Sequence, residues 1–118
     1  MKYILLIYGV EADWTSLSQE EMERVYRGHM AYLQEMQEAG IYLGGHELKP
    51  TGTAATVRFE LGKTHTVDGP FAETKEQLGG FYLIDVPDME SALAWAAKMP
   101  GCYNDSCVEV RPLGMGAE

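Results

Sequence analysis

The chain has 118 residues, 46% of them apolar, so it can build one core but has no room for a separate cofactor domain. Its 9 basic and 18 acidic residues give a formal net charge of −9, which repels phosphate backbones and argues against nucleic-acid binding. No apolar run approaches the roughly 20 residues that span a bilayer. The apolar run at the N-terminus lacks the cleavage site of a signal peptide, so we expect no membrane association and a cytoplasmic location.

The first third of the chain predicts a strand followed by a helix. Residues 2–9 form a continuous apolar run, which is typical of a central strand, and residues 10–17 are expected to form a loop. Ser18 and Glu21 have the spacing of a capping box, and Gly40 is placed to end the helix in a left-handed conformation. Between them, apolar residues recur at helical spacing: Met22, Val25, Tyr26, Met30, Leu33 and Met36.

The remainder of the chain predicts five more strands and a second helix. Pro50-Thr51-Gly52 breaks the second strand, Asp88 caps the second helix, and Pro100-Gly101 stops it. The expected elements are a strand at 41–48, a hairpin of strands at 53–61 and 63–67, a strand at 79–86, a helix opening at Asp88 and a strand at 107–112.

Apart from the inserted hairpin, the order of elements is βαββαβ. This order predicts an α+β, ferredoxin-like fold, a single domain at 1–112 with a frayed tail at 113–118. Both helices should pack on one face of the sheet. The chain is too short to supply a third layer, so the other face is expected to be covered by a second copy, sheet against sheet, in a homodimer.

Neither the thiols nor the histidines suggest a metal site. Cys102 and Cys107 form neither a disulfide framework nor a complete ligand set, and incidental thiols are favoured over a redox pair. His29, His46 and His65 have no ligand spacing. We therefore expect no metal and no cofactor.

A rigid turn followed by charged residues is the first candidate for chemistry. Asp68-Gly69-Pro70 is a turn by composition, and polar residues fill positions 73–77. Asp68 is suited to act as a base or to anchor a hydroxyl, and Lys75 to stabilise an oxyanion. A purely structural turn with a solvated loop remains the alternative.

His29 is the second candidate. Its spacing places it on the apolar side of the first helix, where it is either a core histidine with a satisfied hydrogen bond or a general base at the boundary between helix and sheet. Arg58, Glu73 and Tyr8 are candidate substrate-binding residues, and Arg58 would hold an anionic group. The larger aromatic residues are favoured as core or dimer contacts over a cofactor platform: Trp14, Trp95, Tyr8 and Tyr26.

Four segments resemble the YCII-related family, in the branch called DGPF proteins. They are residues 3–8, 66–76, 78–82 and 108–112. The resemblance covers nearly the whole chain and implies a ferredoxin-like fold that assembles as a dimeric α/β barrel, with a pocket between helices and sheet.

The resemblance also implies a catalytic dyad, in which a histidine on the first helix pairs with an aspartate late in the chain. His29 falls at the histidine position. The family's aspartate precedes a proline, but here Met99 precedes Pro100. We therefore take Asp68 as the hypothetical partner of His29.

Two functions remain open from the sequence. The first is a metal-independent enzyme that performs acid–base chemistry on a small organic molecule, with His29, Asp68 and Lys75 as its catalytic residues. The alternative is a non-catalytic dimeric module that binds a small molecule or regulates a partner, which the missing aspartate before Pro100 favours. The resemblance associates DGPF proteins with sigma-factor regulation.

Overall fold

A computed structural model shows an α+β protein and describes residues 1–102 and 105–115. Its elements are β1 (Lys2–Gly9), α1 (Glu11–Thr15), α2 (Gln19–Glu38), β2 (Tyr42–Glu47), a 3-10 turn η1 (Thr51–Thr53), β3 (Ala55–Glu60), β4 (Lys63–Asp68), β5 (Gln77–Asp85), α3 (Met89–Ala96) and β6 (Cys107–Pro112). The predicted strands and both predicted helices are confirmed within a few residues. No helix of the described part is long and apolar enough to cross a membrane.

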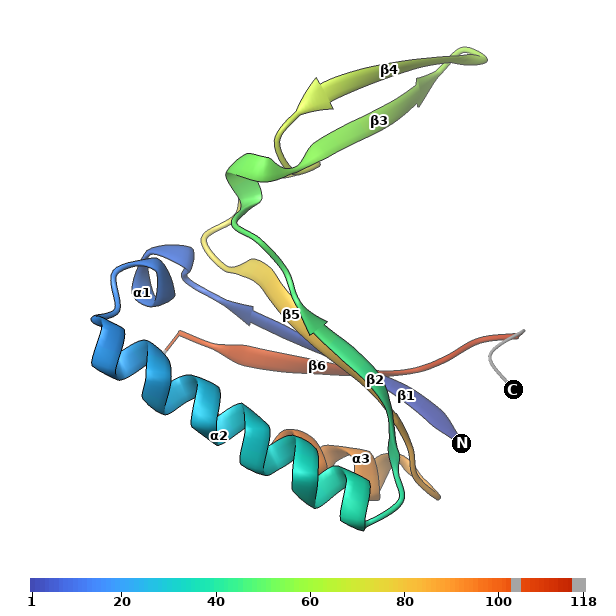
Figure 1. Ribbon diagram of the computed structural model, residues 1–118. Helices are drawn as coiled ribbons and strands as arrows, with labels where there is room; N and C mark the ends of the chain where they lie inside the picture. The colour runs from blue at the N-terminus through green and yellow to red at the C-terminus, as the bar shows by residue number, and fades with distance from the viewer. Residues whose placement is uncertain (103–104, 116–118) are drawn as a thin grey trace.

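The four-stranded sheet has the order β2-β5-β1-β6, and every neighbouring pair is antiparallel. Without the β3–β4 hairpin, this is the strand order of a ferredoxin-like fold. Helices α2 and α3 lie on the same face of the sheet (Figure 1). The core lies between these layers and is built from Tyr3, Leu5, Tyr32, Met36, Ile84, Val86, Ala92 and Met99.

Helix α2 begins and ends as predicted, but only part of its predicted apolar stripe packs on the sheet. Both bonds of the Ser18–Glu21 capping box form, and Gly40 has a φ of +73°. Tyr32 and Met36 are the buried residues of α2, while three residues of the predicted stripe are exposed: Met22, Tyr26 and Met30. Apolar spacing allowed two neighbouring stripes on this helix, and the amphipathic Tyr32 belongs to the one that packs.

The predicted loop at 10–17 was wrong, because Glu11–Thr15 forms the short helix α1. A helix of this length is marginal alone and needs tertiary support. The Glu11 carboxylate provides it by accepting hydrogen bonds from the Thr51 backbone N–H at 2.6 Å and the Thr51 hydroxyl at 2.7 Å. These contacts join segments 40 residues apart, so local sequence could not reveal them.

The sheet face opposite the helices is open; the strands β1 and β5 make it apolar at its centre, and β6 adds the Glu109–Arg111 ion pair at one side. Alternation along β1 points Tyr3 and Leu5 into the core and the neighbouring residues to the other face. There Ile4 lies opposite Leu83, and Leu6 lies opposite Phe81 across β1 and β5. All four residues on this face are half-exposed.

Strands β3 and β4 form a separate two-stranded sheet that extends away from the body (Figure 1). We call residues 55–68 the arm. The chain reverses at Leu61 and Gly62, which have φ angles of 48° and 78°. Every residue of the arm except Thr56 is exposed.

The tail predicted at 113–118 lies partly outside the described residues, since 116–118 are not among them. The Leu113 backbone N–H donates to the Lys2 carbonyl at 2.9 Å. Leu113 therefore still contacts the first strand.

Candidate functional site

The residues with the clearest chemical character meet between α2 and β5. Nδ1 of His29 lies 2.7 Å from the hydroxyl of Tyr82, which comes from the helix side of β5. The two rings stack with an interplanar angle of 23° and centroids 6.0 Å apart. We call His29, Tyr82 and the residues that contact them the seam site.

Glycines let the backbone close around the pair. A Cβ on Gly45 of β2 would lie 2.7 Å from both Cδ1 of Tyr82 and the Phe81 carbonyl, so the Tyr82 ring needs glycine there. Gly101 has a φ of +75°, and a Cβ at that position would lie 3.7 Å from Nε2 of His29. The turn after α3 therefore runs beside the second ring nitrogen of His29.

Aromatic residues hold Tyr82 in place. Tyr32 and Tyr42 contact its ring edge-on, with centroids 5.4 and 6.4 Å away. Tyr32 is itself fixed, because its hydroxyl donates to the Trp95 carbonyl at 2.7 Å. This packing restricts the orientation of the hydroxyl that His29 meets.

Burial shapes the protonation of the pair. Burial lowers the pKa of His29, and the nearby carboxylate of Glu47 opposes that shift in part. Burial raises the pKa of Tyr82 to about 12, and Tyr42 adds to the shift. At neutral pH the pair is therefore a neutral imidazole against a protonated phenol.

The Tyr82 oxygen can accept a hydrogen bond from Nδ1–H of His29, which leaves a lone pair on Nε2. If Nε2 takes a proton, Nδ1–H still donates to Tyr82, so the same contact serves both charge states. This is how a residue that orients a histidine supports proton transfer. The second nitrogen is then the chemically available atom.

Asp68 occupies a different environment from His29. It is exposed at the end of β4, opposite Ala55 in the arm. Among the described residues, the hydrogen-bond partner of His29 is Tyr82, and no bond joins His29 to Asp68. Within a single chain, the hypothetical His29–Asp68 contact is thus not formed.

The other predicted residues are also spread over the molecule. Lys75 is exposed and lies 4.0 Å from the carboxylate of Asp105. Arg58 donates from Nη2 to the Phe71 carbonyl at 2.8 Å, so it binds the chain's own backbone. Tyr8 lies opposite Leu78 and Cys107, one position beyond the core-packed Ile7, which places it on the open sheet face.

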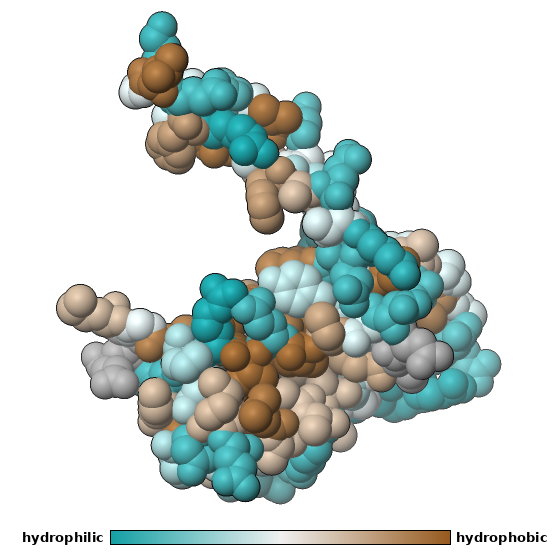
Figure 2. Space-filling model, turned by 180° about the vertical axis from the view of Figure 1, so that it is seen from behind, coloured by the Kyte–Doolittle hydropathy of each residue, from teal (hydrophilic) through white to brown (hydrophobic). Residues whose placement is uncertain are grey.

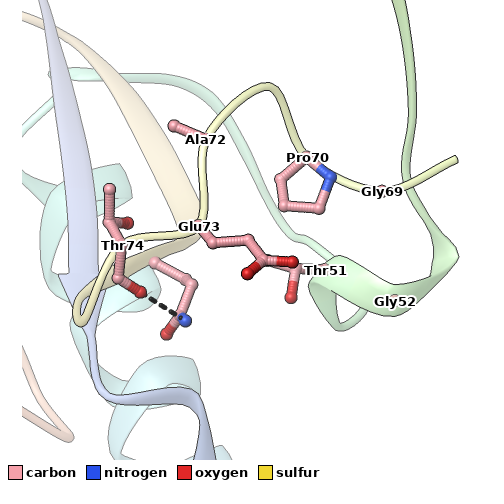
Figure 3. A pocket seen from close by; sticks show the side chains of 8 residues that line it. Thr51, Gly52, Gly69, Pro70, Ala72, Glu73 and Thr74 are labelled. Carbon is pink, nitrogen blue, oxygen red and sulfur yellow. Dashed lines mark hydrogen bonds between the residues drawn. The ribbon is translucent and has the colours of Figure 1, made fainter. Parts of the chain in front are cut away.

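Glu73 lines an open pocket of about 470 Å³ at the base of the arm. Its carboxylate points toward Thr51, across from Gly69 and Pro70 (Figure 3). The Gln77 side chain closes one side by donating to the Thr74 carbonyl at 2.7 Å. None of His29, Asp68 and Lys75 is among the residues that line this pocket.

Tyr82 is the residue that sequence reasoning missed. Its signal was present, because alternation with the buried Ile84 places Tyr82 on the helix side of β5. A tyrosine hydroxyl in that position needs a partner, and His29 was already expected on the facing helix.

The position at which the resemblance implies an aspartate is occupied by a core residue. Met99 is buried, with 7% of its surface exposed, and belongs to the main apolar cluster. It therefore offers no carboxylate to the seam site. Gly28 and Pro100 complete the contact there, since a Cβ on Gly28 would lie 3.2 Å from Pro100.

The two thiols are free, and burial raises the pKa of both Cys102 and Cys107. Both therefore remain thiols at neutral pH, which does not favour nucleophilic chemistry. Within residues 1–102 and 105–115, no three His, Cys, Asp or Glu side chains gather as metal ligands.

These features define a ferredoxin-like α+β domain with a histidine–tyrosine pair between its helices and its sheet. Residues 1–114 match the YCII-related domain, and the chain belongs to the YCII-related family. It is also 43% identical over 116 residues to an uncharacterized protein of Rhizobium meliloti (strain 1021), a match that covers 98% of this chain and 94% of that protein.

Proposed function

We propose that this YCII-related protein binds a small organic molecule beside His29 and transfers a proton to or from it. Nε2 of His29 is the atom that exchanges the proton, and Tyr82 is a positioning residue that fixes the ring. The observation that carries the proposal is the 2.7 Å contact between Nδ1 of His29 and the Tyr82 hydroxyl. It leaves Nε2 as the nitrogen available to a ligand.

The direction of the His29 pKa supports this role. A histidine with a lowered pKa is neutral at pH 7, so it is ready to accept a proton. The aromatic side chains around the pair suit an uncharged or weakly charged organic molecule with an acidic C–H or O–H group. The two residues with a role in this proton transfer, His29 and Tyr82, both belong to a single chain.

The experiment is solvent deuterium exchange into a panel of small carbon acids, namely 2-oxo acids and unsaturated lactones. We expect the wild type to speed exchange in at least one member. His29→Gln should lower that rate by at least about 100-fold, because it removes the base. Tyr82→Phe should lower it by about tenfold and shift the pH profile, since it leaves the ring without its orienting partner.

Asp68→Asn is the matched test of the pairing expected from sequence. If the pairing proposed here is correct, this change leaves exchange close to the wild-type rate. A loss as large as that of His29→Gln would instead restore Asp68 as the partner. Lys75→Met tests the predicted oxyanion role in the same way.

A second candidate function is a non-catalytic binding or regulatory module, as in the regulatory association of DGPF proteins. The specific observation in its favour is the buried Met99 at the position of the family's aspartate. Under this alternative, members of the panel would perturb the His29 ring signals in NMR spectra without any exchange. Binding would also survive His29→Gln.

We further propose that the chain forms a homodimer in which the open sheet faces pack together, giving a dimeric α/β barrel. The support is the apolar row of Ile4, Leu6, Phe81 and Leu83 on the uncovered face. A sheet needs cover on its apolar face, and a second copy supplies it with two-fold symmetry.

A further inference from the structure

The single chain is too extended for a self-sufficient domain. Its radius of gyration is 16.0 Å, whereas a compact domain of this length has about 13.5 Å. Its accessible surface is 8252 Å², which exceeds by about 1,900 Å² the surface of a compact monomer of this mass. A standard interface buries only about 800 Å² per partner, so the surplus is large enough for a stable dimer.

The arm accounts for much of this shape, and its two sides differ. The β3–β4 register places Ala55, Val57 and Phe59 on one side, with Thr64, Thr66 and Asp68 beside them. We call this the apolar side of the arm. Val57 is 53% exposed and Phe59 is 80% exposed, so both lack cover. The opposite side carries Thr56, Arg58, Glu60, Lys63, His65 and Val67.

The base of the arm is tied to itself by hydrogen bonds. The Gly69 N–H donates to the Ala54 carbonyl at 2.7 Å, and the Thr56 hydroxyl donates to the Gly69 carbonyl at 2.8 Å. Gly69 has a φ of +100°, which glycine adopts readily. Arg58 adds its bond to the Phe71 carbonyl. The motif at 68–71 therefore fixes how the returning strand leaves the arm.

The base is also tied to the body. Glu11 of α1 holds Thr51 through two hydrogen bonds, and the Gln77 side chain accepts from the Glu11 N–H at 3.1 Å. An arm anchored in this way keeps one orientation before it binds a partner. Such preorganisation lowers the entropy cost of docking.

A second copy of this chain is the occupant that the surfaces favour. A lone two-stranded ribbon is marginal in water, so the arm needs a surface to pack on. The open sheet face of the same chain is apolar and uncovered, and Figure 2 shows the hollow between the arm and the apolar surface of the body. A two-fold pair that packs its open sheet faces together can also bring each arm against the second copy, so that both apolar surfaces gain cover.

Charge favours the same partner. Within the arm, Arg58 and Lys63 balance Glu60 and Asp68, so the formal net charge of −9 lies on the remainder of the chain. A neutral arm can approach an acidic body without the repulsion that two bodies feel.

We propose that the arm is a dimer clasp, in which the apolar side of each arm docks on a second copy of the chain and the turn at Asp68–Pro70 holds it in the docking direction. This inference rests on the proposed homodimer and adds to its sheet-against-sheet contact. Val57 and Phe59 are the anchoring residues. Gly69 and Pro70 position the arm and touch no partner.

The test compares two variants of the full chain by sedimentation equilibrium. The clasp variant Val57→Ser/Phe59→Ser removes the apolar side, and the control variant His65→Ser/Val67→Ser changes the opposite side of the same ribbon. Loss of the buried anchor pair of one arm should weaken affinity by about tenfold, and a two-fold dimer contains two arms. The clasp variant should therefore raise the dimer dissociation constant by about 100-fold, and the control by less than about threefold.

The outcomes separate the clasp from the homodimer itself. A wild type that stays monomeric at all concentrations overturns both. A dimer that the clasp variant leaves intact overturns the clasp alone, as does an equal loss in both variants. Circular dichroism checks that each variant keeps its fold.

A second measurement does not depend on the stability of a variant. A photoreactive benzoylphenylalanine at position 59 replaces one aromatic side chain by another. The clasp predicts covalent dimers on irradiation, with the link mapped by mass spectrometry from residue 59 to a different chain. Links confined to the same chain would refute it.

Discussion

At the scale of single residues, the central feature of the candidate site is a half-buried histidine whose ring keeps a hydrogen bond. His29 lies on a helix that packs on the sheet, and Tyr82 supplies the hydrogen bond that a buried imidazole requires. Removing either partner leaves a polar group without its bond, which typically costs about 1–3 kcal/mol. The hydrogen bond of the pair is thus a source of stability.

The lowered pKa of His29 predicts a specific loss of stability in acid. Because burial lowers the native pKa, the unfolded chain binds a proton more readily than the native chain. The His29 contribution is therefore fully present above the unfolded pKa of about 6.5 and is lost as pH falls below that value toward the native pKa. Urea unfolding from about pH 8 to about pH 5 measures it.

His29→Gln should flatten this part of the pH dependence. The matched control is His65→Gln, because His65 is exposed on the arm and should leave the curve unchanged. Identical curves for wild type and His29→Gln would show that burial does not govern the protonation of His29.

Gly45 offers a second residue-scale prediction. A Cβ there would lie 2.7 Å from the Phe81 carbonyl, and backbone cannot move aside as a side chain end can. We expect Gly45→Ala to lower the free energy of unfolding by about 1–3 kcal/mol. The neighbouring Gly44→Ala meets no atom within 4 Å and serves as control. Equal effects on urea midpoints would contradict the steric argument.

At the scale of elements, some helices and strands follow from local sequence signals, and others depend on tertiary contacts. Ser18 and Glu21 fixed the start of α2 from sequence, because both bonds of a capping box lie within four residues. The apolar run of β1 likewise identified a central strand. By contrast, α1 depends on Glu11 reaching Thr51, and no local pattern reports such a contact.

In the candidate site, too, one residue followed from local sequence and its partner depended on tertiary structure. His29 followed from helical spacing and lies between helix and sheet as expected, half-buried. The identity of its partner depended on how β5 packs against α2, which is a tertiary relation. The phenol of Tyr82 is the hydrogen-bond partner in place of the predicted carboxylate. The signature at 68–76 identified the chain's resemblance but, in the structure, it joins the arm to β5 rather than reaching His29.

The capping box of α2 gives the element-scale prediction. Ser18→Ala removes the acceptor of the Glu21 N–H, whose bond is 3.1 Å long, and should cost about 1 kcal/mol of stability. The pKa of Glu21 should rise toward its ordinary value, because its bond with Ser18 is what lowers it. Ser16→Ala, on an exposed residue just outside α2, is the control. Unchanged midpoints in urea would mean that the helix end is frayed in solution.

At the scale of the whole molecule, apolar surface and charge act against each other. The open sheet face and the apolar side of the arm favour association. A formal net charge of −9 on each chain opposes it, since a dimer brings −18 together. Salt strongly changes only the charge repulsion, because screening shortens the range of electrostatic interactions.

The proposed dimer should therefore tighten as salt is added. Between about 0.02 M and about 0.3 M sodium chloride, the screening length falls from roughly 20 Å to under 10 Å, which weakens repulsion between the two acidic bodies. The apolar contacts of Phe59 and of the sheet face do not lose strength over this range. Sedimentation equilibrium at the two salt concentrations measures the change in the dissociation constant. A dimer that instead weakens with salt would be held by ion pairs. Arg58 and Lys63, on the side of the arm opposite Val57 and Phe59, would then face acidic groups of the second copy. The apolar side of the arm would point to solvent, which contradicts the clasp.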